Sequence, residues 1–243
     1  MQRQAANQMG SAMNGIVNFI PEDDRADLLS EYFFMFKSLN KQLALAGLSE
    51  IPLDAEAIGR ISLDSKEQLK RHIEKLGEMV EVLTASVRVL GLHPSHFYLR
   101  SALKKFGWQI DADAFESLGE RDTIEIYGAD FSLKLANLRF IEVCSYSFDE
   151  VMRHQFFALF ERDQLITQKL LEAAGKLFRG ELKTTRDLGP DHVVRERFSK
   201  RRRSFWMKPQ LATVVRSKSK AIEAILYSAT VSVDGDSDYG VTV

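Results

Sequence analysis

The sequence has little of several features that define whole classes of protein. Its 243 residues include a single cysteine, Cys144, so no disulfide can form within the chain and a cysteine-based zinc site is not expected. No run of about 18 apolar residues occurs, so the sequence predicts no membrane-spanning helix. The N-terminal stretch MQRQAANQMGSAMNGIVNF lacks the apolar core of a signal peptide, and we therefore expect a cytoplasmic protein.

Motifs of the common enzyme classes are also missing. The chain contains no GxxxxGKS/T, GxGxxG, HExxH or GxSxG pattern. Among the five histidines, His93 and His96 are close in sequence, but no acidic or cysteine ligand lies at helical spacing beside them. We interpret this pair as part of a surface loop. The sequence therefore predicts no metal site, and we interpret the chain as a protein without enzymatic activity.

The composition is that of a globular protein, but its charge is unevenly distributed. Apolar residues make up 45% and charged residues 28% of the chain, whose length is typical of one or two domains. Residues 176–220 contain fourteen lysines and arginines and four acidic residues, a net charge of +10. Because the whole chain carries −1, the remainder carries −11. Such asymmetry indicates either an anionic partner or charge pairing within the chain.

The positive charge is densest between residues 195 and 203. Clustered cations bind phosphates, and interleaved aromatic residues (Phe198, Phe205 and Trp206) are typical of proteins that bind single-stranded nucleic acid. The alternative, which we favour, is a solvated β-hairpin whose charges prevent unwanted sheet pairing. An acidic protein surface is a partner at least as well supported as nucleic acid. The candidate anion-binding residues are Arg195, Arg197, Lys200, Arg201, Arg202 and Arg203.

The first half of the chain has helical periodicity. Apolar residues at steps of three and four predict a helix over 22–46, followed by a connector with a short helical turn over 47–63. A further amphipathic helix is predicted over 95–106, with Ser95 as its N-cap.

The helix predicted after Asp64 has the most regular pattern. Asp64 and Glu67 match the spacing of a capping box. Apolar residues then recur at alternating steps of four and three, at Leu69, Ile73, Leu76, Val80, Leu83, Val87 and Leu90. This heptad suits packing on the 22–46 helix within the chain, or pairing with a second chain, and a four-helix bundle of two hairpins would satisfy both. We therefore hypothesise a homodimer.

From residue 119 the periodicity changes to that of strands. Short alternating segments predict strands, and an amphipathic segment after Asp163 predicts a helix. The predicted order is strands at 123–127 and 132–136, short helices at 148–160, a longer helix at 163–178, and strands at 192–198, 204–215 and 221–233. This order predicts an α+β fold in which a five-stranded antiparallel sheet carries helices on one face and follows an N-terminal helical bundle.

Three segments of this half have a familiar order. IEIYGADFSLKLANLRFIEVCSYSFDEVM contains two strands joined by a turn, with Asn137 at the end of the second strand and Phe140 three residues later. FFALFERDQLITQKLLEAAGKLFRGE leads through an aspartate into the longer helix, and RSFWMKPQLATVVRSKSKAIEAILYSATVSV has the form of a closing hairpin. Together, over about residues 121–233, they resemble the PAS domain, a sensory fold common in bacterial signalling proteins. The resemblance covers about half of the chain.

The resemblance implies a pocket or docking face, whose candidate residues by family position are Asn137, Phe140, Tyr146, Phe157 and Trp206. The chain departs from the family at Ser145, where glycine is usual, and at Ser219-Lys220, where Asp-Gly is usual. PAS domains that bind haem usually place a histidine in the long helix, and residues 163–178 contain none. The cysteine motif of light-sensing flavin domains is also missing, so we expect neither haem nor flavin.

These observations predict four regions. We expect a flexible N-terminus at 1–20, a helical dimerisation or transmission region at 21–118, a PAS-like domain at 119–235 and a tail at 236–243. The functional hypothesis is a non-enzymatic signalling protein whose PAS-like domain senses a small ligand or docks a partner protein. The alternative is a regulator that binds nucleic acid or another anionic partner through residues 195–203.

Overall fold

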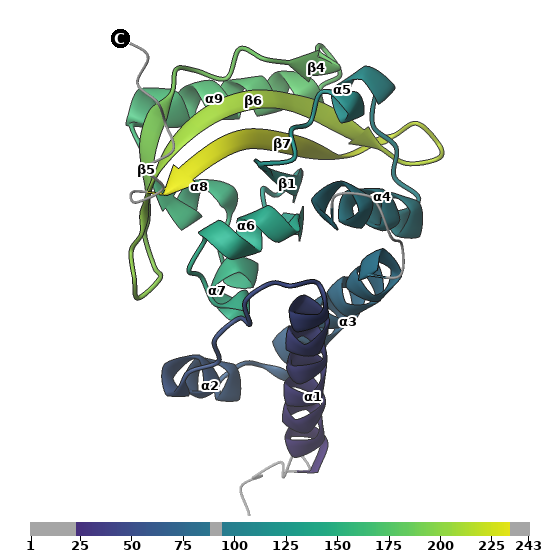
Figure 1. Cartoon of the computed structure of the whole chain (residues 1–243), viewed down its shortest axis with the longest axis vertical. Helices are drawn as coiled ribbons and strands as arrows, with labels where there is room; N and C mark the ends of the chain where they lie inside the picture. The colour runs from purple at the N-terminus through teal and green to yellow at the C-terminus, as the bar shows by residue number, and fades with distance from the viewer. Residues whose placement is uncertain (1–22, 88–93, 234–243) are drawn as a thin grey trace, which may run out of the picture.

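The computed structural model describes residues 23–87 and 94–233, and Figure 1 shows how their helices and strands are arranged. The N-terminal part contains α1 (Asp23–Leu45), α2 (Ala55–Ser62), α3 (Lys66–Val87), α4 (Pro94–Phe106) and α5 (Ala112–Glu116). The next part contains β1 (Asp122–Gly128), β2 (Leu133–Ala136), α6 (Leu138–Val143), α7 (Phe148–Arg153), α8 (Phe156–Leu159) and β3 (Phe160–Glu161). The last part contains α9 (Gln164–Phe178), β4 (Thr184–Thr185), β5 (His192–Glu196), β6 (Ser204–Arg216) and β7 (Ile222–Val233). In the described part of the chain, no helix is long and apolar enough to cross a bilayer.

The predicted α+β order of N-terminal helices followed by an antiparallel sheet is confirmed. Within the described residues the sheet has seven strands, not five, in the order β2-β1-β7-β6-β5-β3, with β4 pairing with β6. The two strands that the sequence did not predict, β3 and β4, have two residues each. Segments this short show no alternation of apolar and polar residues, so periodicity cannot detect them.

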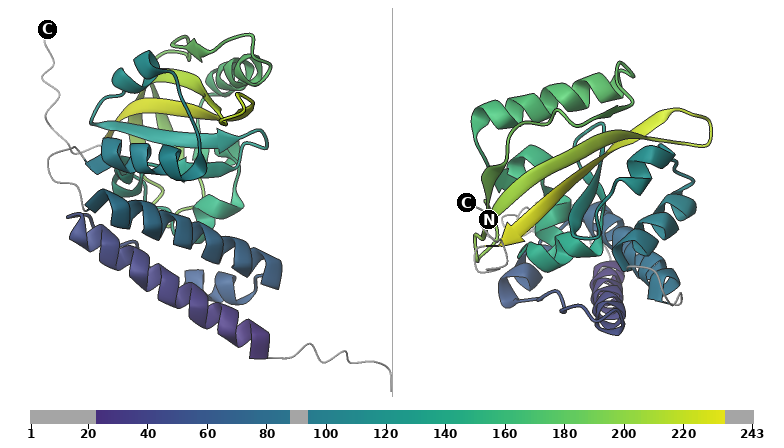
Figure 2. Two further views of the ribbon diagram at one scale, coloured as in Figure 1. Left: turned by 90° about the vertical axis from the view of Figure 1, so that its right-hand side faces the viewer. Right: turned by 45° about the horizontal axis from the view of Figure 1, so that its top comes forward.

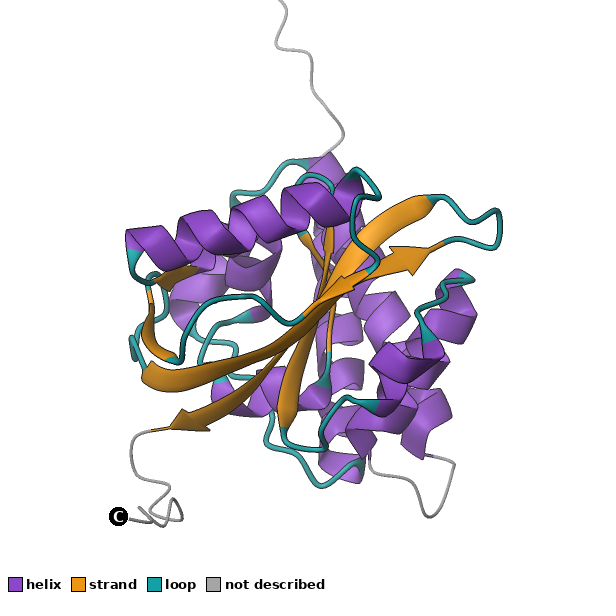
Figure 3. Cartoon of the chain, turned by 90° about the horizontal axis from the view of Figure 1, so that it is seen from above, coloured by secondary structure: helices purple, strands orange, loops and turns teal. Residues whose placement is uncertain are grey.

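The sheet carries helices on both faces, so the prediction of helices on one face was wrong. Successive side chains of β7 alternate between two hydrophobic cores: Leu226 packs with α1, α3 and α4, whereas Tyr227 packs with α6, α8 and α9. We call these the first core and the second core. Figures 2 and 3 show the strands enclosed between α9 and the N-terminal helices. All seven residues of β1 are buried, as expected of a strand covered on both faces.

The heptad helix packs against α1 within the chain. Leu69, Leu76 and Leu83 are fully buried in the first core, with Ile73 and Val80 partly buried beside them. Their partners on α1 include Tyr32 and Leu39. The side chain of Val87, and all of Leu90, lie outside the described residues. One of the two packing arrangements expected from the heptad is therefore present, and the homodimer stays a prediction.

Two predicted helix N-caps were wrong. The capping box of α3 is formed by Ser65 and Gln68, because Gln68 N donates to Ser65 Oγ at 3.2 Å and Ser65 N donates to Gln68 Oε1 at 2.8 Å. Asp64 is turned inward instead. Helix α4 begins at Pro94, a residue favoured in the first turn because it has no N–H to satisfy, so Ser95 lies inside the helix and is not its N-cap.

We predict that Leu76→Ala destabilises the protein by about 2–5 kcal/mol, because it removes a fully buried side chain and leaves a cavity. Phe34→Ala is the matched control on α1, since Phe34 is 68% exposed, and its effect should stay within about 0.5 kcal/mol. Urea unfolding followed by circular dichroism measures both changes. Equal effects for the two variants would contradict the packing described for α3.

Candidate functional site

An apolar cavity of about 60 Å³ lies where the C-terminal half, from residue 119 onward, meets the N-terminal helices. Its walls come from β2, from α6 and α7 with the loop between them, and from Ile51 and Met79 of the N-terminal half. We call it the junction cavity. A water molecule occupies about 30 Å³ of liquid, so the cavity has room for only a few non-hydrogen atoms. Met79 and Met152 have flexible thioether side chains that can adapt to a larger guest.

Two of the five sequence-predicted pocket residues, Phe140 and Tyr146, line the junction cavity. Asn137 lies beside them but has a structural role. Its Oδ1 accepts hydrogen bonds from the backbone N–H groups of Ile124 (3.0 Å) and Phe140 (3.1 Å), while its Nδ2 donates to the backbone oxygen of Asp122. Asn137 therefore caps α6 and fixes that helix to β1.

The other two candidates lie elsewhere. Phe157 is 36% exposed, and its ring packs edge-on against Phe131. Trp206 is 48% exposed and points away from the second core, because its neighbours Phe205 and Met207 in β6 occupy that core. The structure therefore does not bring all five candidates into one pocket.

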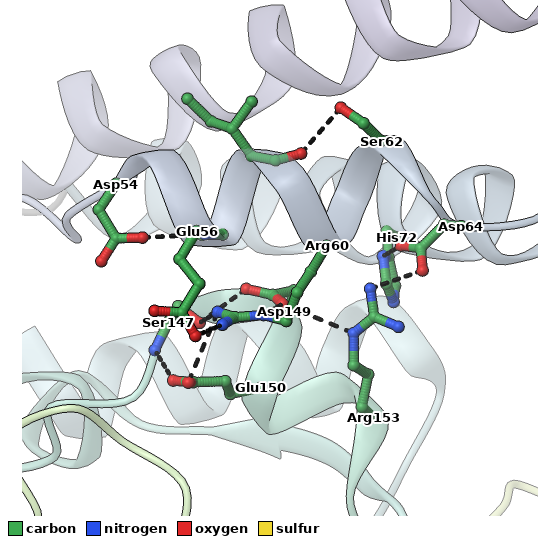
Figure 4. Close-up of polar contacts among 12 residues, drawn as sticks. Asp54, Glu56, Arg60, Ser62, Asp64, His72, Ser147, Asp149, Glu150 and Arg153 are labelled. Atoms are coloured by element: carbon green, nitrogen blue, oxygen red, sulfur yellow. Dashed lines mark hydrogen bonds and ion pairs between the residues drawn. The ribbon is translucent and has the colours of Figure 1, made fainter.

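A network of buried charges joins α7 to the N-terminal half (Figure 4). Arg60 of α2 donates from Nε to Asp149 Oδ2 at 2.9 Å, and its Nη2 lies 3.5 Å from Glu150 Oε1. Arg153 of α7 donates from Nη2 to Asp64 Oδ1 at 2.5 Å. Asp64 and Asp149 are almost completely buried, whereas the two arginines are partly exposed. We call these five residues the junction network.

The two arginines of the junction network face its three carboxylates and keep Asp149 ionised. Burial acts to raise the pKa of Asp149, but hydrogen bonds from Arg60 and Ser147, with the charges of both arginines, hold it below the usual value. Asp149 is therefore ionised at neutral pH. Removing one member of a buried ion pair leaves the other charge uncompensated. A displaced α7 would leave Asp149 in that state, so the ion pairs favour the position of α7 against α2.

His72 of α3 lies at the edge of the junction network. Its Nδ1 is 3.4 Å from Asp64 Oδ2, and its ring is packed between Tyr32 and Phe148. Burial lowers the pKa of His72, and the charge of Arg153 adds to this, while Asp64 and Asp149 act in the opposite direction. His72 is therefore neutral in the folded protein at neutral pH.

This shift predicts a loss of stability in mild acid. The unfolded chain takes up a proton at His72 near pH 6.5 and the folded chain only at lower pH, so the contribution of His72 is complete above pH 6.5 and is lost as the pH falls below it. We expect His72→Phe to reduce the difference in unfolding free energy between pH 7.5 and pH 5.5. His154 and His192, whose pKa values are also lowered by burial, should preserve part of the difference. An unchanged difference in urea unfolding would show that His72 is accessible to protons.

A second polar group lies inside the second core. The guanidinium of Arg162, between β3 and α9, is placed over the rings of Phe156 (4.4 Å) and Phe160 (5.7 Å). Its three nitrogens are buried, and none has a hydrogen-bond partner within residues 23–87 and 94–233. Buried polar atoms are usually hydrogen-bonded, so this cation is an exception that needs a physical account.

The surroundings of Arg162 compensate its charge only in part. Glu125 accepts a hydrogen bond from the Tyr127 hydroxyl, and burial raises the pKa of Glu125 to about 7, so this carboxyl is only partly ionised at neutral pH. Tyr127 and Tyr227 are buried around the same cation. Both also line a second cavity, of about 40 Å³, beneath α9. Arg162 itself does not line this cavity, whose walls are apolar and aromatic.

We predict that Arg162→Met leaves the free energy of unfolding unchanged or raises it, because methionine fills the same space without a buried charge. Arg203→Met is the control: Arg203 Nη1 donates to the backbone oxygen of Val143 at 2.9 Å, and its loss should be destabilising. Thermal and urea unfolding distinguish the two variants. A loss above about 1 kcal/mol for Arg162→Met would show that the guanidinium stabilises the fold.

The cations of residues 195–203 fall into two groups. Lys200 contacts Asp54 (2.7 Å) and Glu56 (3.0 Å), while Arg202 contacts Glu161 (3.0 Å) and Arg203 the backbone of Val143. These cations are used within the chain. The side chains of the second group are exposed and make no ion pair within the described residues; they are Arg195, Arg197 and Arg201.

Neither metal nor thiol chemistry is indicated in the described part of the chain. No three histidine, cysteine or acidic side chains lie close enough together there to hold a metal ion, and His93 lies outside it. Cys144 lines the junction cavity, and burial raises the pKa of its thiol well above the usual value. A thiol that stays protonated is a weak nucleophile.

Comparisons with known proteins add little. No protein-family model matches the chain, and no curated protein matches it. A solved structure described as an RNA-binding Light-Oxygen-Voltage receptor is similar at 14% identity and a TM-score of 0.32, over 85% of this chain. This chain spans 60% of the length of that receptor. At this identity and TM-score the likeness assigns neither a family nor a function to this chain.

Proposed function

We propose that this chain is a non-enzymatic signalling sensor in which a small ligand in the PAS-like half is coupled to the N-terminal helices. The observation that carries the proposal is the shared junction cavity, which is lined by Phe140 and Tyr146 on one side and by Ile51 and Met79 on the other. A ligand that occupies or enlarges this cavity must move side chains of both halves. In this proposal the sensing part is residues 119–235, and the responding part is residues 21–118.

Helix α7 supplies the coupling. Val151 and Met152 of this helix line the junction cavity, while Asp149 and Arg153 of the same helix belong to the junction network. A shift of α7 therefore changes an apolar contact and a charged contact together. The ligand acts as a population shift, because it favours whichever arrangement of α7 binds it better.

The responding part is suited to contact another protein. Helix α1 exposes Phe34 (68%) and Leu45 (60%), which supply apolar surface for a second copy of the chain or for a signalling partner. Homodimerisation and a protein partner both belong to this proposal.

The alternative function, binding of an anionic partner by residues 195–203, is supported for only part of that segment. Lys200, Arg202 and Arg203 contact groups of this chain. The exposed cations Arg195, Arg197 and Arg201 make no ion pair within the described residues and are available to a partner.

Native mass spectrometry of the full chain, purified from its own host, tests the proposed sensor. We expect a retained small molecule that leaves under denaturing conditions. Val151→Phe should abolish the retention, because the larger side chain fills the junction cavity. Leu165→Phe, a substitution at a position of α9 that is 75% exposed, is the matched control and should keep the molecule.

Two results would contradict the sensor. One is a wild-type protein that carries no molecule, and the other is a Val151→Phe variant that is folded and retains as much molecule as wild type. Thermal unfolding of both variants establishes that they are folded.

A further inference from the structure

The side of the sheet that carries the first core is exposed to solvent at its β5 end. In β5 and β6, the side chains of Val194, Phe205 and Met207 point into the second core. Val193 and Trp206 point the opposite way and are 54% and 48% exposed. The strand register places them directly opposite each other, which brings their Cβ atoms within about 4.5–5.5 Å. The result is an exposed aromatic and aliphatic pair on a rigid strand pair.

The helices of the first core cover this face only at its other end. Leu211 and Val215, further along β6, are fully buried in that core together with Leu226 of β7. Figure 1 shows α4 at the right of the molecule and β5 at the left. Within the described residues, the surface around Trp206 is therefore left open to solvent.

Two cations flank Trp206 on the same face. Arg195 follows Val193 by two residues in β5, and Lys208 follows Trp206 by two residues in β6, so alternation places all four side chains on one side. Arg195 pairs with Ser204 and Lys208 with Thr230, which puts one cation before and one after Trp206 along β6. Both are exposed, and neither side chain makes an ion pair or hydrogen bond within residues 23–87 and 94–233. Positions 204 and 208 are about 13 Å apart along the strand.

We infer that this surface, the β5–β6 face formed by Val193, Arg195, Trp206 and Lys208, binds single-stranded nucleic acid. A base stacks on the Trp206 ring, and the phosphates on either side of that base are neutralised by Arg195 and Lys208. Stacking on an aromatic side chain needs a base whose face is free, which a single strand offers and a duplex does not. The net charge of +10 over residues 176–220 attracts the strand. The inference is independent of the proposed ligand site, because none of the four residues of the β5–β6 face lines the junction cavity.

Fluorescence anisotropy of the full chain with labelled 12-nucleotide oligouridylate and oligothymidylate, between 50 and 200 mM salt, provides the test. We expect binding that weakens with salt. Trp206→Ala should weaken it at least about fivefold, the lower end of what one stacked base contributes. Arg195→Gln and Lys208→Gln should each reduce the slope of log affinity against log salt by about 0.7, the effect of one phosphate contact on a single strand.

The controls separate this face from general charge and from the sensor. Lys41→Gln removes an exposed charge on α1 and should leave the affinity and slope unchanged. Trp206→Phe should restore much of the binding lost in Trp206→Ala, and Val151→Phe should bind the strand as wild type does. A duplex of the same length should bind more weakly than the single strand.

Three results would overturn the inference. The first is no binding of either oligonucleotide by the wild-type chain at 50 mM salt. The second is a folded Trp206→Ala variant that binds like wild type. The third is competition by polyglutamate as effective as that by the oligonucleotide at equal charge, which would assign the face to an acidic protein surface instead.

Discussion

Burial of both faces of β1 and β7 is the constraint on which the other features depend. The apolar side chains along the middle of these strands point alternately into one core and the other, so the sheet needs helices on both sides. The N-terminal helices meet that need by covering Ile124, Ile126 and Leu226. Their separation from the sheet would expose these side chains to water, at a cost of about 25 cal/mol for each Å² of apolar surface.

The charged groups are arranged around this apolar framework. The junction network lies at the margin of the first core, where the two arginines reach solvent while Asp64 and Asp149 do not. Arg162 lies inside the second core, where aromatic rings surround it. In the first arrangement both arginines face carboxylates, whereas in the second the guanidinium has no hydrogen-bond partner within the described residues. The two sites therefore contribute differently: one joins the two halves of the chain, and the other places a cation among aromatic rings.

The long elements could be predicted from the sequence because their signals are local. Helices α1, α3 and α9 and strands β1, β6 and β7 have clear periodicity over many residues. The capping box of α3 was predicted one residue too early, because Asp64–Glu67 and Ser65–Gln68 both have the required spacing. Asp64 is instead bound by Arg153, which lies 89 residues away in the sequence, and a local pattern cannot show that contact. The direction of Trp206 was not predictable for a related reason. Both faces of the sheet are apolar, so the pattern does not show which face holds the pocket, and one step along a strand reverses every side chain.

Helix α7 has six residues, fewer than two full turns, and a helix of that length is not stable by itself in water. Its capping box between Ser147 and Glu150 closes only the first turn. Helix α7 is therefore ordered by what it touches, namely Arg60 and Asp64 across the junction network and the walls of the cavity. Loss of either set of contacts would let this segment unfold locally while the sheet stays intact. In the proposed sensor, the two halves would then be coupled by a change in the order of one short segment, without a rigid movement of either half.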